Sequence, residues 1–145
     1  MLVGSSLGEI VDNAFSHNIG QWSNDIGPLV IGLMQNNIQK RELTVSICDF
    51  GVGFLQTIQH NFPKIVTEAG AVSLALKANI TGRPNQRGGN GLLFLQKNIF
   101  NGFKGMLSIR STNTLVNVTD FNKCEIITEE LPFSRGVNIY FSVQY

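Results

Sequence analysis

Apolar residues recur at intervals of three and four over residues 5–18, which is the pattern of an amphipathic helix. The positions that give this period are Leu7, Ile10, Val11, Ala14 and Phe15. Polar residues four apart form a second row, made of Glu9, Asn13 and His17, with Asp12 and Ser16 beside it. Residues i and i+4 lie one above the other on a helix. The pattern therefore predicts a helix with one face in a core and a polar row on another face.

The rest of the chain alternates between strand-like and helix-like patterns. Strands are predicted at residues 29–35, 43–49, 105–111, 113–118, 124–128 and 136–143, and further helices at 66–78 and 92–100. The first two strands are expected to form an antiparallel hairpin, and residues 57–65 have no regular pattern. This order predicts one α+β domain over residues 1–145. We expect a two-layer sandwich with helices on one face of a mixed, mainly antiparallel sheet.

Composition narrows the class of protein. Of the 145 residues, 43% are hydrophobic and 14% are charged, as in a soluble globular domain with a buried core. The formal net charge of +1 gives no electrostatic reason to expect nucleic acid or an acidic membrane surface as a partner. No apolar run approaches the ~20 residues that a bilayer requires, so membrane insertion is not expected. Cys48 and Cys124 lie far apart without zinc-site spacing, so we expect buried thiols and a reducing cytoplasm.

The polar row on the first helix has two interpretations. A carboxylate, a carboxamide and an imidazole in one row could hold a hydrated cation or direct a water molecule. Alternatively, Ser6 and Glu9 have the spacing of a capping box, in which Ser6 would be the N-cap residue. Asparagine is mildly unfavourable inside a helix, so Asn13 favours the functional interpretation slightly.

A second polar stretch, Asp49-Phe-Gly-Val-Gly53, directly follows a predicted strand. The glycines at 51 and 53 would let the backbone approach a ligand without an intervening side chain. An ionised aspartate only accepts hydrogen bonds, so Asp49 suits an amino group such as that of adenine. The alternative is an aspartate-initiated turn in which the glycines provide sharp dihedral angles.

A third polar stretch, residues 81–91, reads TGRPNQRGGNG and leads directly into the helix predicted at 92–100. A glycine-rich loop at a helix N-terminus presents free N–H groups and the positive end of the helix dipole, which favour phosphate. Arg83 and Arg87 add positive charge there. The stretch lacks the Lys-Ser/Thr pair of a Walker motif, and the alternative is a flexible surface loop.

In order and spacing, the three stretches together resemble the ATP-binding domain of the GHKL superfamily, the Bergerat fold. Its members include gyrase, the ninety-kilodalton heat-shock chaperone, histidine kinases and the mismatch-repair ATPase. Residues 9–14 resemble the family's N-box, residues 49–53 its first glycine box and residues 87–92 its second. The likeness covers essentially the whole chain.

The resemblance implies that the ligands are ATP and Mg²⁺, and it gives each matched residue a role. Asp49 would accept a hydrogen bond from the adenine amino group, and Gly53 would lie beneath the base. Asn13 would ligate the magnesium that bridges the phosphates, and Glu9 would be the general base. The other implied ATP-binding positions are His17, Gly51, Arg87, Gly88, Gly89, Asn90, Gly91 and Leu92. Residues 54–87 would form the ATP lid.

Two positions depart from the family pattern. Many relatives have glycine where this chain has Leu93, and a threonine hydroxyl usually stands where this chain has Val137. Because few residues precede the N-box, we expect a domain excised or shortened from a longer protein. His17 favours the histidine-kinase-like branch.

The resemblance predicts that the γ-phosphoryl group is transferred to a protein partner or, slowly, to water. One alternative is a non-catalytic nucleotide switch that gates a protein partner. Another is a structural module whose glycines merely form turns.

Overall fold

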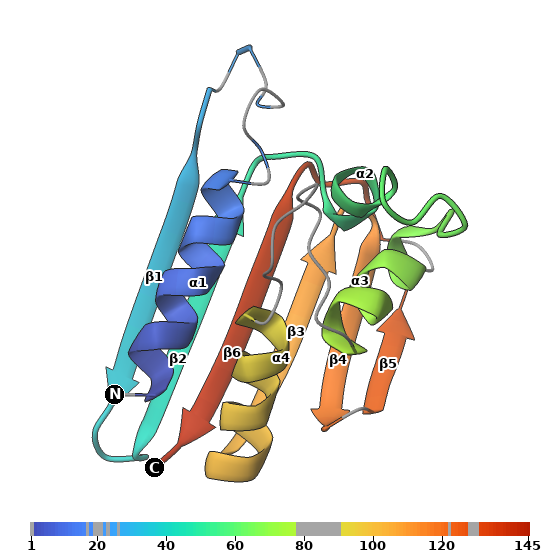
Figure 1. Ribbon diagram of the computed structural model, residues 1–145. Coiled ribbons are helices and arrows are strands. Elements are labelled where there is room, and N and C mark those ends of the chain that lie inside the picture. Colours follow the sequence, from blue (N-terminus) through green and yellow to red (C-terminus); the bar gives the residue numbers. More distant parts are fainter. Residues whose placement is uncertain are drawn as a thin grey trace.

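The computed structural model describes residues 2–16, 18, 22, 24–25, 27–77, 91–121, 123–127 and 131–145. In chain order the elements are α1 (Leu2–Ser16), β1 (Val30–Asn37), β2 (Glu42–Asp49), α2 (Phe54–Ile58), α3 (Glu68–Lys77), α4 (Gly91–Lys97), the π-helical turn η1 (Asn98–Gly102), β3 (Lys104–Ser111), β4 (Thr114–Asp120), β5 (Lys123–Ile127) and β6 (Val137–Gln144). The strands form one sheet in the order β1-β2-β6-β3-β4-β5, and α1, α3 and α4 lie on one of its faces (Figure 1). The predicted α+β class and the two-layer arrangement are confirmed.

Every neighbouring pair of strands in this sheet is antiparallel, so the prediction of a mixed sheet is wrong. The chain passes from β2 through three helices to β3, and these two strands point the same way. However, β6 lies between them, and its Ile139 pairs with Ile47 of β2 on one side and Ile109 of β3 on the other. The insertion of the last strand therefore replaces one parallel pairing by two antiparallel ones.

The core lies between the sheet and the helices. Val45 of β2 and Leu107 of β3 both pair with Phe141 of β6, which is fully buried. The helical residues that pack against this face are Ile10, Val72, Ala75, Leu76, Leu92, Leu95 and, from η1, Ile99. Burying each large side chain contributes about 1.5–3 kcal/mol, so this face holds the helices in place.

Local structure differs from the sequence predictions at three places. Because α1 begins at Leu2, Ser6 lies inside the helix, and the capping-box interpretation of Ser6 and Glu9 is wrong. Residues 54–58, where no helix was predicted, form the short helix α2. The helix predicted at 92–100 begins at Gly91, and its last turn is π-helical.

The structure also bears on two expectations drawn from composition, which concern the cysteines and membrane insertion. Cys48 is a free, half-buried thiol, and burial together with the nearby charge of Asp49 raises its pKa. The side chain of Cys124 lies outside the described residues. Within the described ranges, none of the helices has both the length and the apolar character that crossing a bilayer demands.

Candidate functional site

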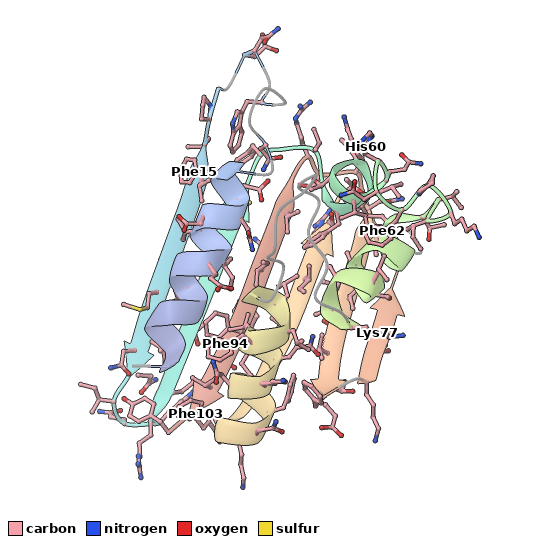
Figure 2. All side chains as sticks on the ribbon, in the orientation of Figure 1. Phe15, His60, Phe62, Lys77, Phe94 and Phe103 are labelled. Carbon is pink, nitrogen blue, oxygen red and sulfur yellow. The ribbon has the colours of Figure 1, made fainter. Side chains whose placement is uncertain are left out.

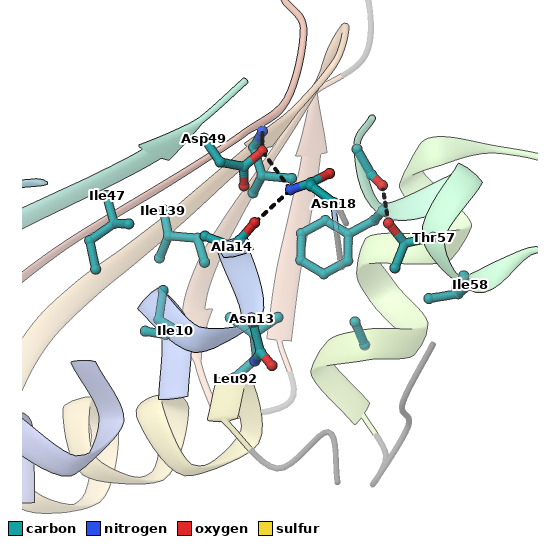
Figure 3. Close-up of a pocket in the computed structure, with 14 residues that line it drawn as sticks. Ile10, Asn13, Ala14, Asn18, Ile47, Asp49, Thr57, Ile58, Leu92 and Ile139 are labelled. Carbon is teal, nitrogen blue, oxygen red and sulfur yellow. Dashed lines mark hydrogen bonds between the residues drawn. The ribbon is translucent and has the colours of Figure 1, made fainter. Parts of the chain in front are cut away.

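A pocket of about 790 Å³, including space open to solvent, lies between the four helices α1–α4 and the adjoining ends of β2 and β6. Its apolar lining comes from Ile10, Ala14, Ile47, Phe54, Ile58, Ala75, Leu92, Val137 and Ile139. Its polar lining comes from Asn13, Asn18, Asp49 and Thr57, and Gly53 completes the wall (Figure 3). A largely apolar cavity with a few converging polar groups is the usual form of a small-molecule site.

Among the described residues that line this pocket, Asp49 is the charged one, and it is only 6% exposed. Its Oδ1 atom accepts hydrogen bonds from the backbone N–H of Gly51 at 2.9 Å, from that of Val137 at 3.3 Å and from the amide of Asn18 at 3.4 Å. Burial raises the pKa of Asp49, and these three hydrogen bonds oppose the rise. None of the three donors uses Oδ2, so that oxygen remains available to accept a hydrogen bond from a ligand.

Asn18, a residue that the sequence analysis missed, joins α1 to the loop after β2. It is 4% exposed, and its Nδ2 donates to the carbonyl of Ala14 at 2.7 Å as well as to Asp49. Its Oδ1 accepts the backbone N–H of Val52 at 3.0 Å. A Cβ at Gly51 would lie 1.7 Å from that same oxygen. Gly51 is therefore small to make room for Asn18 and does not line the pocket, unlike the ligand-facing glycine that we predicted.

Gly53, in contrast, lines the pocket and begins α2 with a φ of +88°, a conformation that favours glycine. The carboxylate of Glu68, from the start of α3, accepts the N–H of Phe54 at 2.7 Å and the N–H of Leu55 at 3.2 Å. The hydroxyl of Ser111, at the end of β3, also donates to Glu68. This distant carboxylate caps α2, so local sequence patterns could not reveal the helix.

α2 carries the hydroxyl that faces the pocket. Thr57 lies one turn into the helix, and its Oγ1 donates to the carbonyl of Gly53 at 2.7 Å (Figure 3). With its proton engaged there, the hydroxyl oxygen can still accept a hydrogen bond from a ligand.

The polar row of α1 faces the start of α4. A Cβ at Gly91 would lie 3.0 Å from Oε2 of Glu9 and 3.3 Å from Nδ2 of Asn13. Asn13 also lines the pocket beside Leu92 (Figure 3). Glu9, one turn before Asn13 on α1, is exposed. A carboxamide in the pocket lining and a carboxylate one helical turn away supply the oxygen ligands that a hydrated Mg²⁺ ion prefers.

The start of β6 fixes Asp49 from the opposite side. Gly136 has a φ of +87°, and a Cβ there would lie 1.9 Å from the carbonyl oxygen of Asp49. This close approach brings the N–H of Val137 to the Asp49 carboxylate. A backbone N–H of β6 therefore helps to hold the Asp49 carboxylate in place.

Several of the predicted site residues lie outside the described residues. These are His17, Arg87, Gly88, Gly89 and Asn90. The predicted residues that the structure brings together are Glu9, Asn13, Asp49, Gly53, Gly91 and Leu92. They come from three separate stretches of the sequence. Four of them line the pocket, and Glu9 and Gly91 lie beside Asn13.

No family model and no curated protein matches the chain. What the pocket can bind therefore has to follow from its own geometry and chemistry. Among the described residues, no group of three or more His, Cys, Asp and Glu side chains could hold a metal ion. Magnesium carried mainly by phosphate oxygens and water does not need such a group, because one protein oxygen is enough to fix it.

Proposed function

We propose that this chain is a GHKL-type domain with a Bergerat fold that binds ATP and Mg²⁺ in the pocket. The observation that carries the proposal is the lining itself. Asn13, Asp49, Gly53 and Leu92, predicted separately from the three motif-like stretches, line a single cavity. If these stretches only formed turns, there would be no reason to expect their residues to line the same cavity.

The chemistry of Asp49 supports adenine as the base. Three N–H donors occupy its Oδ1, which leaves Oδ2 as the free acceptor of the carboxylate. One free acceptor suits the single exocyclic amino group of adenine better than the adjacent ring N–H and amino donors of guanine. Ile47, Phe54 and Ile139 provide apolar surface around the base.

The other end of the nucleotide would lie toward the start of α4. Asn13 would supply the protein oxygen for Mg²⁺ there, and Glu9, beside Gly91, would orient a water molecule or an acceptor hydroxyl. Phosphoryl transfer depends mainly on positioning and electrostatics, so one base next to the phosphates is sufficient. We place the reaction in the histidine-kinase-like class, with a protein acceptor or slow hydrolysis, in the cytoplasm.

Isothermal titration calorimetry with a non-hydrolysable ATP analogue and Mg²⁺ tests the binding. The wild-type chain should bind, and Asp49→Asn should weaken binding by about one to two orders of magnitude or more. The reason is that the amide would turn an N–H₂ donor toward the adenine amino group, which costs at least the ~1.5–3 kcal/mol of a hydrogen bond to a charged group. The matched control is Asp120→Asn, at an exposed position outside the pocket. No binding by folded wild-type chain, or equal binding by Asp49→Asn, would refute the proposal.

A second candidate function is a nucleotide switch without turnover. It is favoured by Val137, which offers the site a backbone N–H in place of the family's hydroxyl, and by Leu93 in the first turn of α4. Phosphate release from ATP distinguishes the two functions. Turnover that Glu9→Ala abolishes while binding persists supports the enzyme, and binding without any turnover in the wild-type chain supports the switch.

A further inference from the structure

The two edges of the sheet differ in how they are protected against pairing with another chain. At one edge β5 is five residues long, has an irregular register opposite Val118 and Asp120, and exposes the charged side chains of Lys123 and Glu125. Short length, irregular pairing and charge are the features by which proteins protect a sheet edge. The β5 edge is therefore a protected one.

β1, at the opposite edge, has none of these features. It is eight residues long, it pairs with β2 in an unbroken register, and its sequence VIGLMQNN contains no charged residue and no proline. Ile31 is 51% exposed, Leu33 68% and Met34 66%. A regular, uncharged and apolar edge strand is a template for adding another strand.

Apolar surface is exposed on both faces of this edge. Met34 pairs with the buried Val45 and so lies on the helix-covered face, whereas Leu33 pairs with Ser46 and lies on the open face. On the helix side, Val11 and Phe15 of α1 are also exposed.

Helical geometry directs these two α1 side chains toward the β1 edge. Each is two residues from Asn13, about 200° around the helix, and Asn13 faces α4. Val11 and Phe15 therefore point away from α4. β1 lies on that side of α1 (Figure 1), and Figure 2 shows Phe15 on it. An added strand would cover apolar side chains above and below the sheet edge.

We infer that two copies of this chain associate through antiparallel pairing of β1 with its counterpart. A twofold axis across the edge makes the contact self-complementary, and the strand carries no charge that would call for a charged partner. None of the residues of β1 lines the pocket, so the inference does not depend on the proposed function.

The size of the edge is sufficient for such a dimer. Eight residues at about 3.4 Å each give a length of about 27 Å. One sheet layer and one helix layer give a thickness of about 20 Å. Each copy would then bury about 540 Å², or about 1,100 Å² in total, just above the ~1,000 Å² that a specific interface requires. A reversible dimer with a dissociation constant in the micromolar range is the expected result.

Sedimentation velocity on the 145-residue chain, from about 1 μM to about 1 mM, tests the inference. The wild-type chain should shift from monomer to dimer with concentration. Leu33→Lys should raise the dissociation constant at least tenfold, because it places a charge on each side of the twofold axis. The matched control is Val66→Lys, which changes an equally exposed apolar residue, 71% exposed, in the segment before α3 and should dimerise like wild type.

Circular dichroism of all variants shows whether they are folded, and Ile31→Lys provides a second test if Leu33→Lys is not. A wild-type chain that stays monomeric throughout the range overturns the inference, because the edge is then free or serves another partner. A dimer that folded Leu33→Lys leaves intact overturns it as well, because that dimer would use another surface.

Discussion

Replacing Asn18 by alanine removes the side chain that ties α1 to the loop carrying Asp49. Two short hydrogen bonds are lost, to the Ala14 carbonyl and from the Val52 N–H, together with the longer one to Asp49. Each short bond contributes about 1 kcal/mol, and the unsatisfied Val52 N–H adds about 1 kcal/mol. We therefore expect the free energy of unfolding to fall by about 2–3 kcal/mol, which lowers Tm by about 6–9 °C in a domain of this size.

Urea unfolding followed by circular dichroism measures this change, and exposed Asn101→Ala is the control, expected within about 0.5 kcal/mol of wild type. Asn18→Asp gives a sharper test, because it keeps the acceptor for Val52 but turns a carboxylate toward Asp49. It should cost more than alanine at neutral pH and recover as the pH falls toward about 4. Asn18→Ala as stable as wild type, or Asn18→Asp as stable as wild type at neutral pH, would show that this contact does not hold the loop.

Gly51 provides a cross-check on the same contact. Gly51→Ala alone should be severely destabilising, since its Cβ would lie 1.7 Å from the Asn18 oxygen. In the Asn18→Ala background the clash disappears, so the two changes together should cost clearly less than the sum of their separate effects. Simple additivity would contradict the packing described above.

Three further predictions concern the surroundings of the pocket. Burial raises the pKa of Asp49, so the contribution of Asp49 to stability is greatest below its unfolded-state pKa, about 4, and falls as the pH rises through its folded-state pKa. Urea titrations between about pH 3 and 7 measure this effect. As the pH rises, the wild-type chain should lose stability relative to Asp49→Asn. By the same assay, Gly136→Ala should lower the free energy of unfolding by about 3 kcal/mol or more, because the new Cβ would collide with the backbone of Asp49. The control is Gly102→Ala, where a Cβ would enter open space, and it should lower stability by less than about 1 kcal/mol. Glu68→Ala should lower the free energy of unfolding by about 2–4 kcal/mol. Glu68→Gln should lower it less, because glutamine keeps one oxygen that can accept the Phe54 N–H. Equal losses in the two variants would argue against the capping role of Glu68.

The elements that sequence predicted well are those whose pattern is local. Val45 and Ile47 alternate with polar neighbours, and this alternation is sufficient to predict a strand with one buried face. The helix with Glu9 and Asn13 was predicted in the same way, although its start was placed too late because nothing marks Leu2 as a boundary.

The features that sequence did not predict depend on contacts between distant segments. α2 is capped by Glu68, and the antiparallel sheet follows from where β6 inserts, which no local pattern records. Asn18 stands just after a helix and could be taken for an ordinary helix end. Its buried contacts with Asp49 and Val52 involve residues more than thirty positions away.

The central place of β6 has a consequence for synthesis on the ribosome. Residues 137–144 separate the β1–β2 hairpin from the β3–β5 meander, so the two halves of the sheet cannot join until this last strand has emerged from the exit tunnel. Val137 also donates to Asp49, so the pocket is completed at the same late moment. A nascent chain stalled before residue 137 should therefore expose both inner edges to proteases and chaperones.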